Sequence, residues 1–201
     1  MTRLGILDHG HRRRARVAMR LIPLVAGTGL DDVGKTSLYR PELFGRPWLA
    51  LLRDVMVGPS DWSRGERELL AAFVSNRNRC PYCVGIHTGT ATIGLHREVR
   101  PELLDHWQEA DFGPRLEAAF TLLAGVRDDP DHGAADAAAA ARAAGLSDSA
   151  IVDAYAVAFV FDLVNRLADA FGYSFGDEAG RLAEARALYR LAYKVPGFLL
   201  G

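Results

Sequence analysis

Apolar residues recur at spacings of three and four along most of the chain, and alternating strand patterns are scarce. Ala, Leu, Arg and Glu, which are strong helix formers, dominate these stretches. The pattern therefore predicts an all-α fold. We expect helices over residues 12–26, 41–57, 63–76, 81–93, 98–108, 114–127, 131–144, 148–171 and 178–193.

Two of the predicted breaks carry recognisable helix-end chemistry. Ser63 stands three residues before Glu66, which is the spacing of a capping box at the start of a helix. Gly145 is placed to end one helix, and Ser147 or Asp148 is placed to cap the next. These breaks therefore separate helices that follow one another directly.

The chain has 201 residues, enough for one sizeable hydrophobic core, and no linker interrupts it. We expect a single domain over 1–201 that begins with an N-terminal extension, 1–37. Two similar helical halves would follow. The first half, 38–114, contains both cysteines, and the second, 115–201, contains none.

Composition excludes several kinds of partner. Lys and Arg number 24 against 25 Asp and Glu, so a net charge of -1 offers no field to attract nucleic acid or an anionic membrane. The apolar runs, such as AVAFVF at 156–161, are too short to span a bilayer. The two cysteines lie too close in sequence to staple distant parts of a secreted scaffold, so we expect a cytoplasmic protein.

Both cysteines occur in one Cys-x-x-Cys within ERELLAAFVSNRNRCPYCVGIH, residues 66–87. Pro81 favours the first position of a helix, so Cys80 is expected at the N-cap and Cys83 in the first turn. Helix N-termini stabilise anions and lower a cysteine pKa from about 8.5 to roughly 3.5–7.5. Cys83 is therefore the thiol best placed to become a nucleophilic thiolate.

Positions 80, 83 and 87 are spaced so that they share one helix face. His87 follows Cys83 by one turn and is within reach of its sulfur. Cys80 precedes Cys83 by one turn and can close a disulfide across it. A nucleophile, a resolving thiol and a proton carrier would then lie along one stripe.

Glu68 joins this group only if the chain turns back on itself. On an unbroken helix it would lie about 18 Å from Cys80 along the axis. The stretch NRNR at 76–79, followed by Cys-Pro, is a poor helix continuation, because the residue before proline is pushed out of the helical region. A turn at 77–79 predicts an antiparallel hairpin with Glu68 and His87 at similar depth.

The pattern Glu68-x11-Cys80-x2-Cys83-x3-His87 resembles the signature of AhpD-like alkylhydroperoxidases, in the carboxymuconolactone decarboxylase superfamily. The likeness includes RPELFGRPWLALLRDVMVGPSDWSRGERELLAAFVSNRNRCPYCVGIH. It resumes with AAGLSDSAIVDAYAVAFVFDLVNRLADAFGYSF, which is similar to the second half of the longer, peroxidase-related branch. Together these stretches cover most of residues 38–176.

The resemblance implies an AhpD-like helical fold, a homo-oligomer and a thiol-dependent peroxidase. It implies that a hydroperoxide oxidises Cys83 to a sulfenic acid and that Cys80 condenses with it to a disulfide. Glu68 and His87 would move protons, and an external dithiol or thiol protein would reduce the disulfide. No metal or other cofactor is implied. The best-known relatives carry a second histidine between the cysteines, where this chain has Tyr82.

Other interpretations remain open. The alternatives are that the pair acts as a disulfide reductase or redox sensor, or that it belongs to a non-catalytic helical binding or scaffold protein. Glu68, Cys80, Cys83 and His87 also amount to four zinc ligands, although structural zinc usually draws on two separated knuckles. A c-type haem is excluded, because Val84 stands where CxxCH requires histidine.

A few residues outside this segment have predicted roles. Trp48, Trp62, Trp107 and Phe112 are expected in the core, and a pocket wall near the thiols is the alternative for one or two of them. Asn165 and Arg166 lie in the family-like second half, where we expect a helix-to-helix or subunit contact rather than a pocket role.

Overall fold

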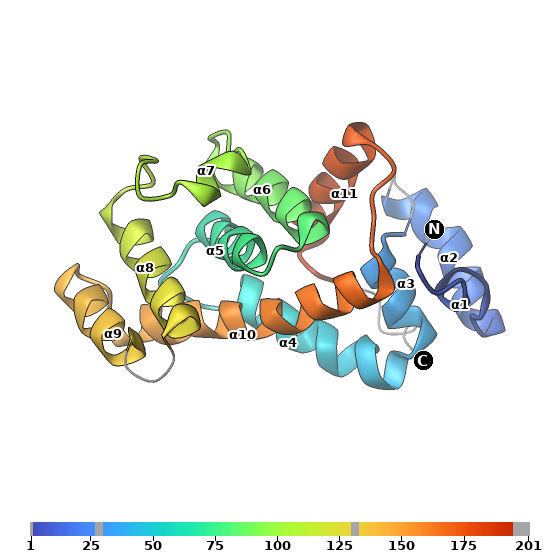
Figure 1. The fold of residues 1–201 in the computed structure, drawn as a ribbon. Helices are drawn as coiled ribbons and strands as arrows, with labels where there is room; N and C mark the ends of the chain where they lie inside the picture. The colour runs from blue at the N-terminus through green and yellow to red at the C-terminus, as the bar shows by residue number, and fades with distance from the viewer. Residues whose placement is uncertain (1, 27–29, 130–132, 195–201) are drawn as a thin grey trace. The chain divides into compact units, whose positions relative to one another are not determined.

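The computed structural model describes residues 2–26, 30–129 and 133–194, and within them it contains helices and no strands (Figure 1). The predicted all-α class is confirmed. The elements in chain order are α1 Ile6–His9, α2 Arg13–Ala26, α3 Asp32–Tyr39, the π-helix η1 Pro41–Gly45, α4 Arg46–Val57, α5 Arg64–Arg77, α6 Pro81–Leu95, α7 Glu102–Asp105, α8 Pro114–Asp128, α9 Gly133–Ala143, α10 Asp148–Phe171 and α11 Glu178–Leu191.

The predicted helix at 98–108 was wrong in extent, since only α7 forms there. The backbone N–H of Val99 donates to the Thr92 hydroxyl at 2.9 Å instead of joining a helix. The predicted helix at 131–144 is α9, and positions 131–132 of that prediction lie outside the described residues. Helix α3 was missed, because glycine and β-branched residues weaken its intrinsic helical preference.

The predicted helix ends are confirmed. Ser63 and Glu66 form a reciprocal capping box at the start of α5. Gly145 follows α9 with φ of 90°, a left-handed conformation that glycine adopts at little cost. The Ser147 hydroxyl then accepts a hydrogen bond from the Ala150 N–H at 3.0 Å, which caps α10.

The chain groups into two compact units. One comprises Met1–Gly58 with Arg166–Gly201, and the other comprises Pro59–Asn165. The two predicted halves, divided near Arg115, were expected to resemble one another. Grouping the chain into compact units does not compare the halves with each other, so their similarity stays a prediction. No helix among the described residues is long and apolar enough to cross a membrane.

The unit of Met1–Gly58 and Arg166–Gly201 joins segments from both ends of the sequence. The Arg3 N–H donates to the Phe171 carbonyl at 2.7 Å. The hydroxyls of Thr36 and Tyr173 hydrogen-bond at 2.5 Å. Helices α2 and α3 share a small apolar cluster that includes Ala18 and Leu38.

The unit Pro59–Asn165 contains the predicted catalytic residues and a larger aromatic core. Phe73 of α5 stacks on Phe120 of α8 with 4.4 Å between ring centroids. The Trp62 indole N–H donates to the Ala150 carbonyl at 2.7 Å. Trp62 and Phe112 are buried, as predicted, whereas Trp107 of this unit and Trp48 of the other unit are only partly buried. This core packs against α5, which forms one arm of the hairpin that carries the site.

Candidate active site

The hairpin between α5 and α6 forms because its turn satisfies both helix ends. Asn78 ends α5, and Arg79 takes a left-handed conformation with φ of 58°. Cys80 is extended, as the residue before Pro81 should be, and its N–H donates to the Ser75 carbonyl at 3.0 Å. The predicted reversal of the chain is therefore confirmed, and α5 and α6 lie side by side.

The hairpin brings Glu68 and His87 into direct contact. The Nδ1 atom of His87 lies 2.7 Å from Oε2 of Glu68. Glu68 is fully buried, and His87 is 5% exposed. The two atoms share one proton. An ionised carboxylate only accepts hydrogen bonds, so with Glu68 ionised the Nδ1–H of His87 would donate and Nε2 would be the proton-accepting nitrogen. The predicted proximity of these two residues is confirmed.

Further contacts hold this pair in place. The Thr90 hydroxyl donates to Oε2 of Glu68 at 2.7 Å. Arg64 Nε lies 4.0 Å from Oε1 of the same carboxylate. The ring of Phe161 meets the His87 ring edge-on, with 4.5 Å between centroids. A buried carboxylate is costly unless it is hydrogen-bonded or paired, and Glu68 is both.

Both cysteines are free thiols at the start of α6. Cys80 is the N-cap residue and Cys83 lies in the first turn, as predicted. Each is 1% exposed, and Tyr82 between them is 6% exposed. The thiols therefore lie beneath the surface, at the helix end where unsatisfied N–H groups favour an anion. The roles assigned to them stay predictions.

The hypothesis of a metal site gains no support from the arrangement of ligand types. Within the described ranges, no group of three or more His, Cys, Asp and Glu residues is arranged to hold a metal ion. Glu68 and His87 instead contact one another directly, and Thr90 occupies a further site on the carboxylate.

The sequence analysis missed Thr90 and the polar network behind the turn. Thr90 follows His87 by three residues, so helical spacing alone puts them on one face. The Asn165 side chain of α10 is 1% exposed and donates to the Ser75 hydroxyl at 3.0 Å. The side-chain amide of Asn78 donates to the side-chain Oδ1 of Asn165 at 2.8 Å. The helix-to-helix contact predicted for Asn165 is thus confirmed.

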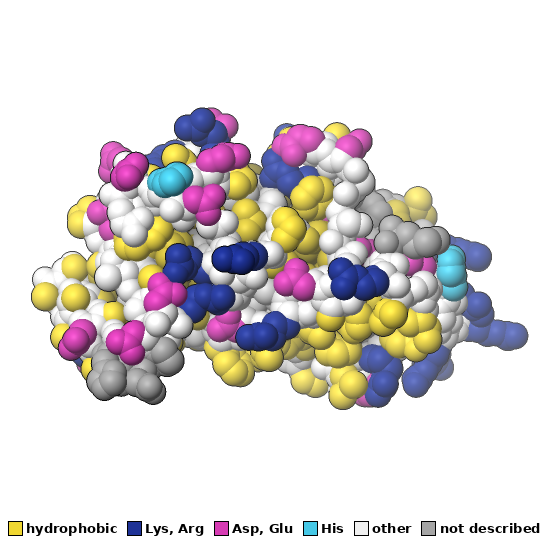
Figure 2. All heavy atoms as spheres, in the orientation of Figure 1, with side chains coloured by type: hydrophobic (Ala, Val, Ile, Leu, Met, Phe, Trp, Pro, Cys, Tyr) yellow, Lys and Arg dark blue, Asp and Glu magenta, His cyan; other side chains and the backbone are white. Residues whose placement is uncertain are grey.

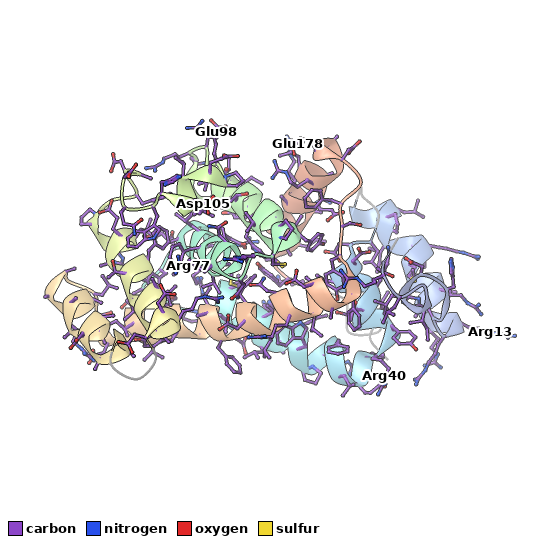
Figure 3. The ribbon with its side chains drawn as sticks, in the orientation of Figure 1. Arg13, Arg40, Arg77, Glu98, Asp105 and Glu178 are labelled. Atoms are coloured by element: carbon purple, nitrogen blue, oxygen red, sulfur yellow. The ribbon has the colours of Figure 1, made fainter. Side chains whose placement is uncertain are left out.

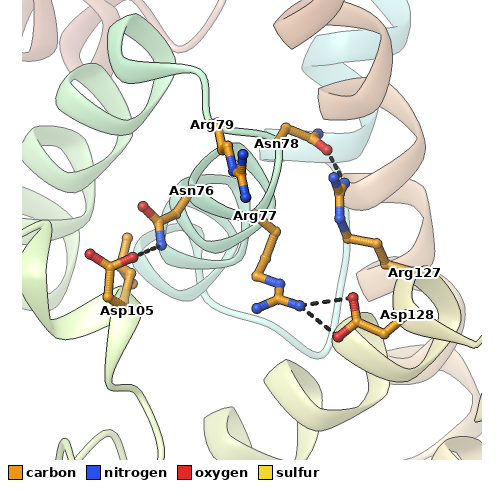
Figure 4. A pocket seen from close by; sticks show the side chains of 8 residues that line it. Asn76, Arg77, Asn78, Arg79, Asp105, Arg127 and Asp128 are labelled. Atoms are coloured by element: carbon orange, nitrogen blue, oxygen red, sulfur yellow. Dashed lines mark hydrogen bonds and ion pairs between the residues drawn. The ribbon is translucent and has the colours of Figure 1, made fainter.

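A polar cavity of about 560 Å³ adjoins the same turn (Figure 4). Arg77 donates to both oxygens of Asp128, and Asn76 donates to Asp105 at 2.9 Å. Figure 3 labels Arg77 at the end of α5 and Asp105 at α7. Figure 2 shows basic side chains with acidic ones among them on this face. The lining residues are Asn76, Arg77, Asn78, Arg79, Leu104, Asp105, Arg127 and Asp128.

Comparison with known proteins gives one matching family model and similar solved folds. Residues 42–125 match the model of the carboxymuconolactone decarboxylase family. The chain is similar to the crystal structure of an alkylhydroperoxidase AhpD core, an uncharacterised peroxidase-related protein from Ralstonia eutropha JMP134. The TM-score is 0.76 at 24% identity, over 91% of this chain and 96% of that one.

A second similar structure is an uncharacterised peroxidase-related protein from Silicibacter sp. TM1040. Its TM-score is 0.74 at 22% identity, over 86% of this chain and 91% of that one. No curated protein matches the chain. The superfamily resemblance and the AhpD-like fold that it implied are confirmed.

Proposed function

Because residues 42–125 match the model of the carboxymuconolactone decarboxylase family and the chain has an AhpD-like fold, we propose that the protein is a thiol-dependent peroxidase that reduces hydroperoxides. The observation that carries the proposal is the Glu68–His87 contact at 2.7 Å in the hairpin that also bears both cysteines. A histidine fixed by a buried carboxylate is suited to moving protons beside a thiol.

The first half-reaction oxidises Cys83. Its thiolate attacks one peroxide oxygen, the O–O bond breaks, and the departing alkoxide takes a proton to leave as an alcohol. Cys83 becomes a sulfenic acid. His87, held through Nδ1 by Glu68, carries the proton through Nε2, and the carboxylate stabilises the imidazolium that forms.

The second half-reaction closes the disulfide. The Cys80 thiolate attacks the Cys83 sulfur, the S–O bond breaks, and hydroxide leaves as water after protonation. An external dithiol or thiol protein then returns two electrons. The substrates are thus a small hydroperoxide and a thiol reductant. The proposal also includes a homo-oligomeric protein of the cytoplasm that uses no cofactor.

The test is peroxide consumption by the reduced protein beside Cys83→Ser and Cys80→Ser. We expect both variants to lose turnover, while Cys80→Ser accumulates a sulfenic acid that dimedone traps. Cys83→Ser should give no such adduct. Equal peroxide consumption by all three proteins would show that the peroxidase proposal is wrong.

The contribution of the Glu68–His87 pair is tested separately with Glu68→Gln. The amide keeps the size of the carboxylate but cannot stabilise the imidazolium, so we expect peroxide turnover to fall by about 100-fold or more. Glu66→Gln is the control, because Glu66 lies on the same helix and serves its cap. Unchanged turnover in Glu68→Gln would show that the Glu68 carboxylate has no role in the proposed proton transfer.

A disulfide reductase is the second candidate, and buried Tyr82 favours it, since the best-known peroxidases of this type carry histidine there. Such an enzyme would use the same two cysteines on a disulfide substrate. Reduction of insulin disulfides without peroxide consumption would select this function.

A further inference from the structure

The polar cavity lies directly beside the Cys-x-x-Cys motif. Four consecutive lining residues, 76–79, form the end of α5 and the turn into Cys80. Arg79 is the peptide neighbour of Cys80, so their Cα atoms are about 3.8 Å apart. Cys83 is three residues further along α6. The cavity wall therefore continues along the chain into the residue that carries the resolving thiol. Neither cysteine is among the lining residues, and each is 1% exposed.

The cavity lining contains three guanidinium groups and two carboxylates. Asp128 neutralises Arg77 through two hydrogen bonds. Arg127 instead bonds the amide oxygen of Asn78, which carries no charge. Nothing in 2–26, 30–129 or 133–194 forms a hydrogen bond or ion pair with the Arg79 side chain. The second lining carboxylate, Asp105, accepts from the uncharged Asn76 amide, so the three arginines and two aspartates of the lining leave one net positive charge.

One further carboxylate stands behind the rim. Asp162 of α10 accepts a hydrogen bond from the Asn78 amide at 2.7 Å and does not line the cavity. It moderates the positive potential but does not occupy Arg79 or Arg127.

The backbone at Arg79 is a second and independent observation. Its φ of 58° is the left-handed conformation that usually selects glycine just after a helix. Arginine tolerates it less well, because its Cβ crowds the backbone. An unfavourable conformation retained at a cavity rim beside reactive residues supports a functional hypothesis for that side chain.

We propose that Arg79 and Arg127 bind the carboxylate of a small anionic thiol, which reduces the Cys80–Cys83 disulfide from this cavity. The guanidinium group matches a carboxylate in charge and geometry. A volume of about 560 Å³ suits a small molecule. The inference rests on the proposed function, in that it requires Cys80 and Cys83 to form a redox pair.

The chemistry consists of two exchanges. A thiolate of the reductant attacks the Cys80 sulfur, the Cys80–Cys83 bond breaks, and Cys83 leaves as a thiolate at the α6 N-terminus. A second reductant thiolate attacks the reductant sulfur of the mixed disulfide and releases Cys80. Two thiols supply two electrons and two protons, and their own disulfide is the product.

The assignment of the cavity to the reductant follows from its position. An attack on Cys80 makes Cys83 the leaving group, and the helix N-terminus stabilises the departing thiolate. A hydroperoxide must instead reach Cys83, which is not adjacent in sequence to the rim.

The experiment starts from protein oxidised with diamide, so that peroxide plays no part. Its disulfide is reduced with 3-mercaptopropionate, 2-mercaptoethanol or cysteamine, which are anionic, neutral and cationic. Each rate is divided by the rate of the same thiol with 2-hydroxyethyl disulfide, which corrects for intrinsic nucleophilicity. We expect the anionic thiol to be favoured over the neutral one by about tenfold, and salt to reduce the preference.

Arg79→Gln and Arg127→Gln should each lose most of this preference, measured as the ratio of the corrected rates with 3-mercaptopropionate and 2-mercaptoethanol. Arg100→Gln, an exposed arginine of the same unit, makes an equal change of net charge away from the cavity and should keep the preference. Arg79→Gly is a second variant at the rim, in which glycine suits the left-handed backbone. Its loss of preference with an intact thermal transition would exclude a folding defect.

Two results would overturn the inference: no preference for the anionic thiol in the parent, or a preference that survives in Arg79→Gln and Arg127→Gln. The protein could consume no peroxide and still show a preference that depends on these arginines. That result would support reductant binding in the cavity and contradict the proposed peroxidase activity. A parent that forms no Cys80–Cys83 disulfide with diamide would overturn both proposals.

Discussion

At the scale of single residues, the carboxylate of Glu68 is the most demanding group in the site. It is fully buried, and it depends on His87 and Thr90 for the hydrogen bonds that water would otherwise supply. The sequence predicted the His87 partner, because the Cys-Pro break imposed a hairpin. It did not reveal Thr90, since threonines on helices more often bond the backbone of their own helix.

Removal of the Thr90 hydroxyl tests this dependence without reference to catalysis. Thr90→Val keeps the shape of the side chain but removes one donor to a buried carboxylate. We expect the free energy of unfolding to fall by about 1–3 kcal/mol, measured by urea denaturation. Thr90→Ser retains the hydroxyl and is the control. Equal stability of the valine variant and the parent would contradict this account of Glu68.

At the scale of helices and turns, the sequence predicted the helix ends that are marked by characteristic capping or proline residues and missed those that depend on tertiary contacts. The α5 and α6 boundaries were predictable, because a capping box and a Cys-Pro pair mark them. Helix α3 was not, since its preference comes from tertiary burial of Leu38 and from the Asp31 cap, whose side chain accepts from the Gly34 N–H. The cavity was also unpredictable, because α7 and α8 complete it from distant sequence.

The turn between α5 and α6 allows a prediction about stability. Arg79 holds φ of 58° where glycine is the preferred residue. We therefore expect Arg79→Gly to raise the free energy of unfolding by about 1 kcal/mol, since it relieves the Cβ crowding. Chemical denaturation measures the change. A clear destabilisation would mean that the arginine side chain stabilises the turn.

The start of α10 provides a prediction about acid stability. Hydrogen bonds from Ser147 and Ser149 hold the pKa of Asp61 below its ordinary value of 3.8. A carboxyl whose pKa is lowered by folding stabilises the protein above its unfolded pKa, and this contribution is lost as the pH falls through the lowered value. The effect therefore lies below about pH 4.

Asp61→Asn removes that titration but keeps an oxygen that accepts from the serines. We expect the stability of the variant to fall less steeply with acid than that of the parent, in denaturation curves recorded from pH 5 to pH 2. Asp136→Asn, at an exposed position of α9, is the control. Identical acid dependence of Asp61→Asn and the parent would count against the effect.

At the scale of the whole molecule, the predicted homo-oligomer remains a proposal, and α10 offers a face for it. Val152, Phe159 and Leu163 are 63%, 59% and 42% exposed. Their spacing of seven and four residues puts them on one side of the helix. Exposed apolar stripes of this kind commonly mark contacts between proteins. We propose a second copy of the chain as the occupant, in line with the homo-oligomer that the resemblance implies.

Phe159→Glu tests this proposal by putting a charge in the centre of the stripe. We expect the variant to sediment as a smaller species than the parent at equal concentration, because burying an unpaired carboxylate opposes association. Ala139→Glu, at an exposed position of α9, is the matched control. An unchanged sedimentation coefficient would move the subunit contact away from this face.

Cys80 and Cys83 are each 1% exposed, so the rate at which their thiols are labelled measures local opening of the structure. A bulky alkylating reagent reaches them only when neighbouring side chains move aside, so the labelling rate is the product of an opening equilibrium and an intrinsic rate. The dependence of that rate on urea then measures how much surface the opening exposes. A shallow dependence would describe a fluctuation of the turn, and a steep one would mean that the thiols react only through unfolding of the whole unit.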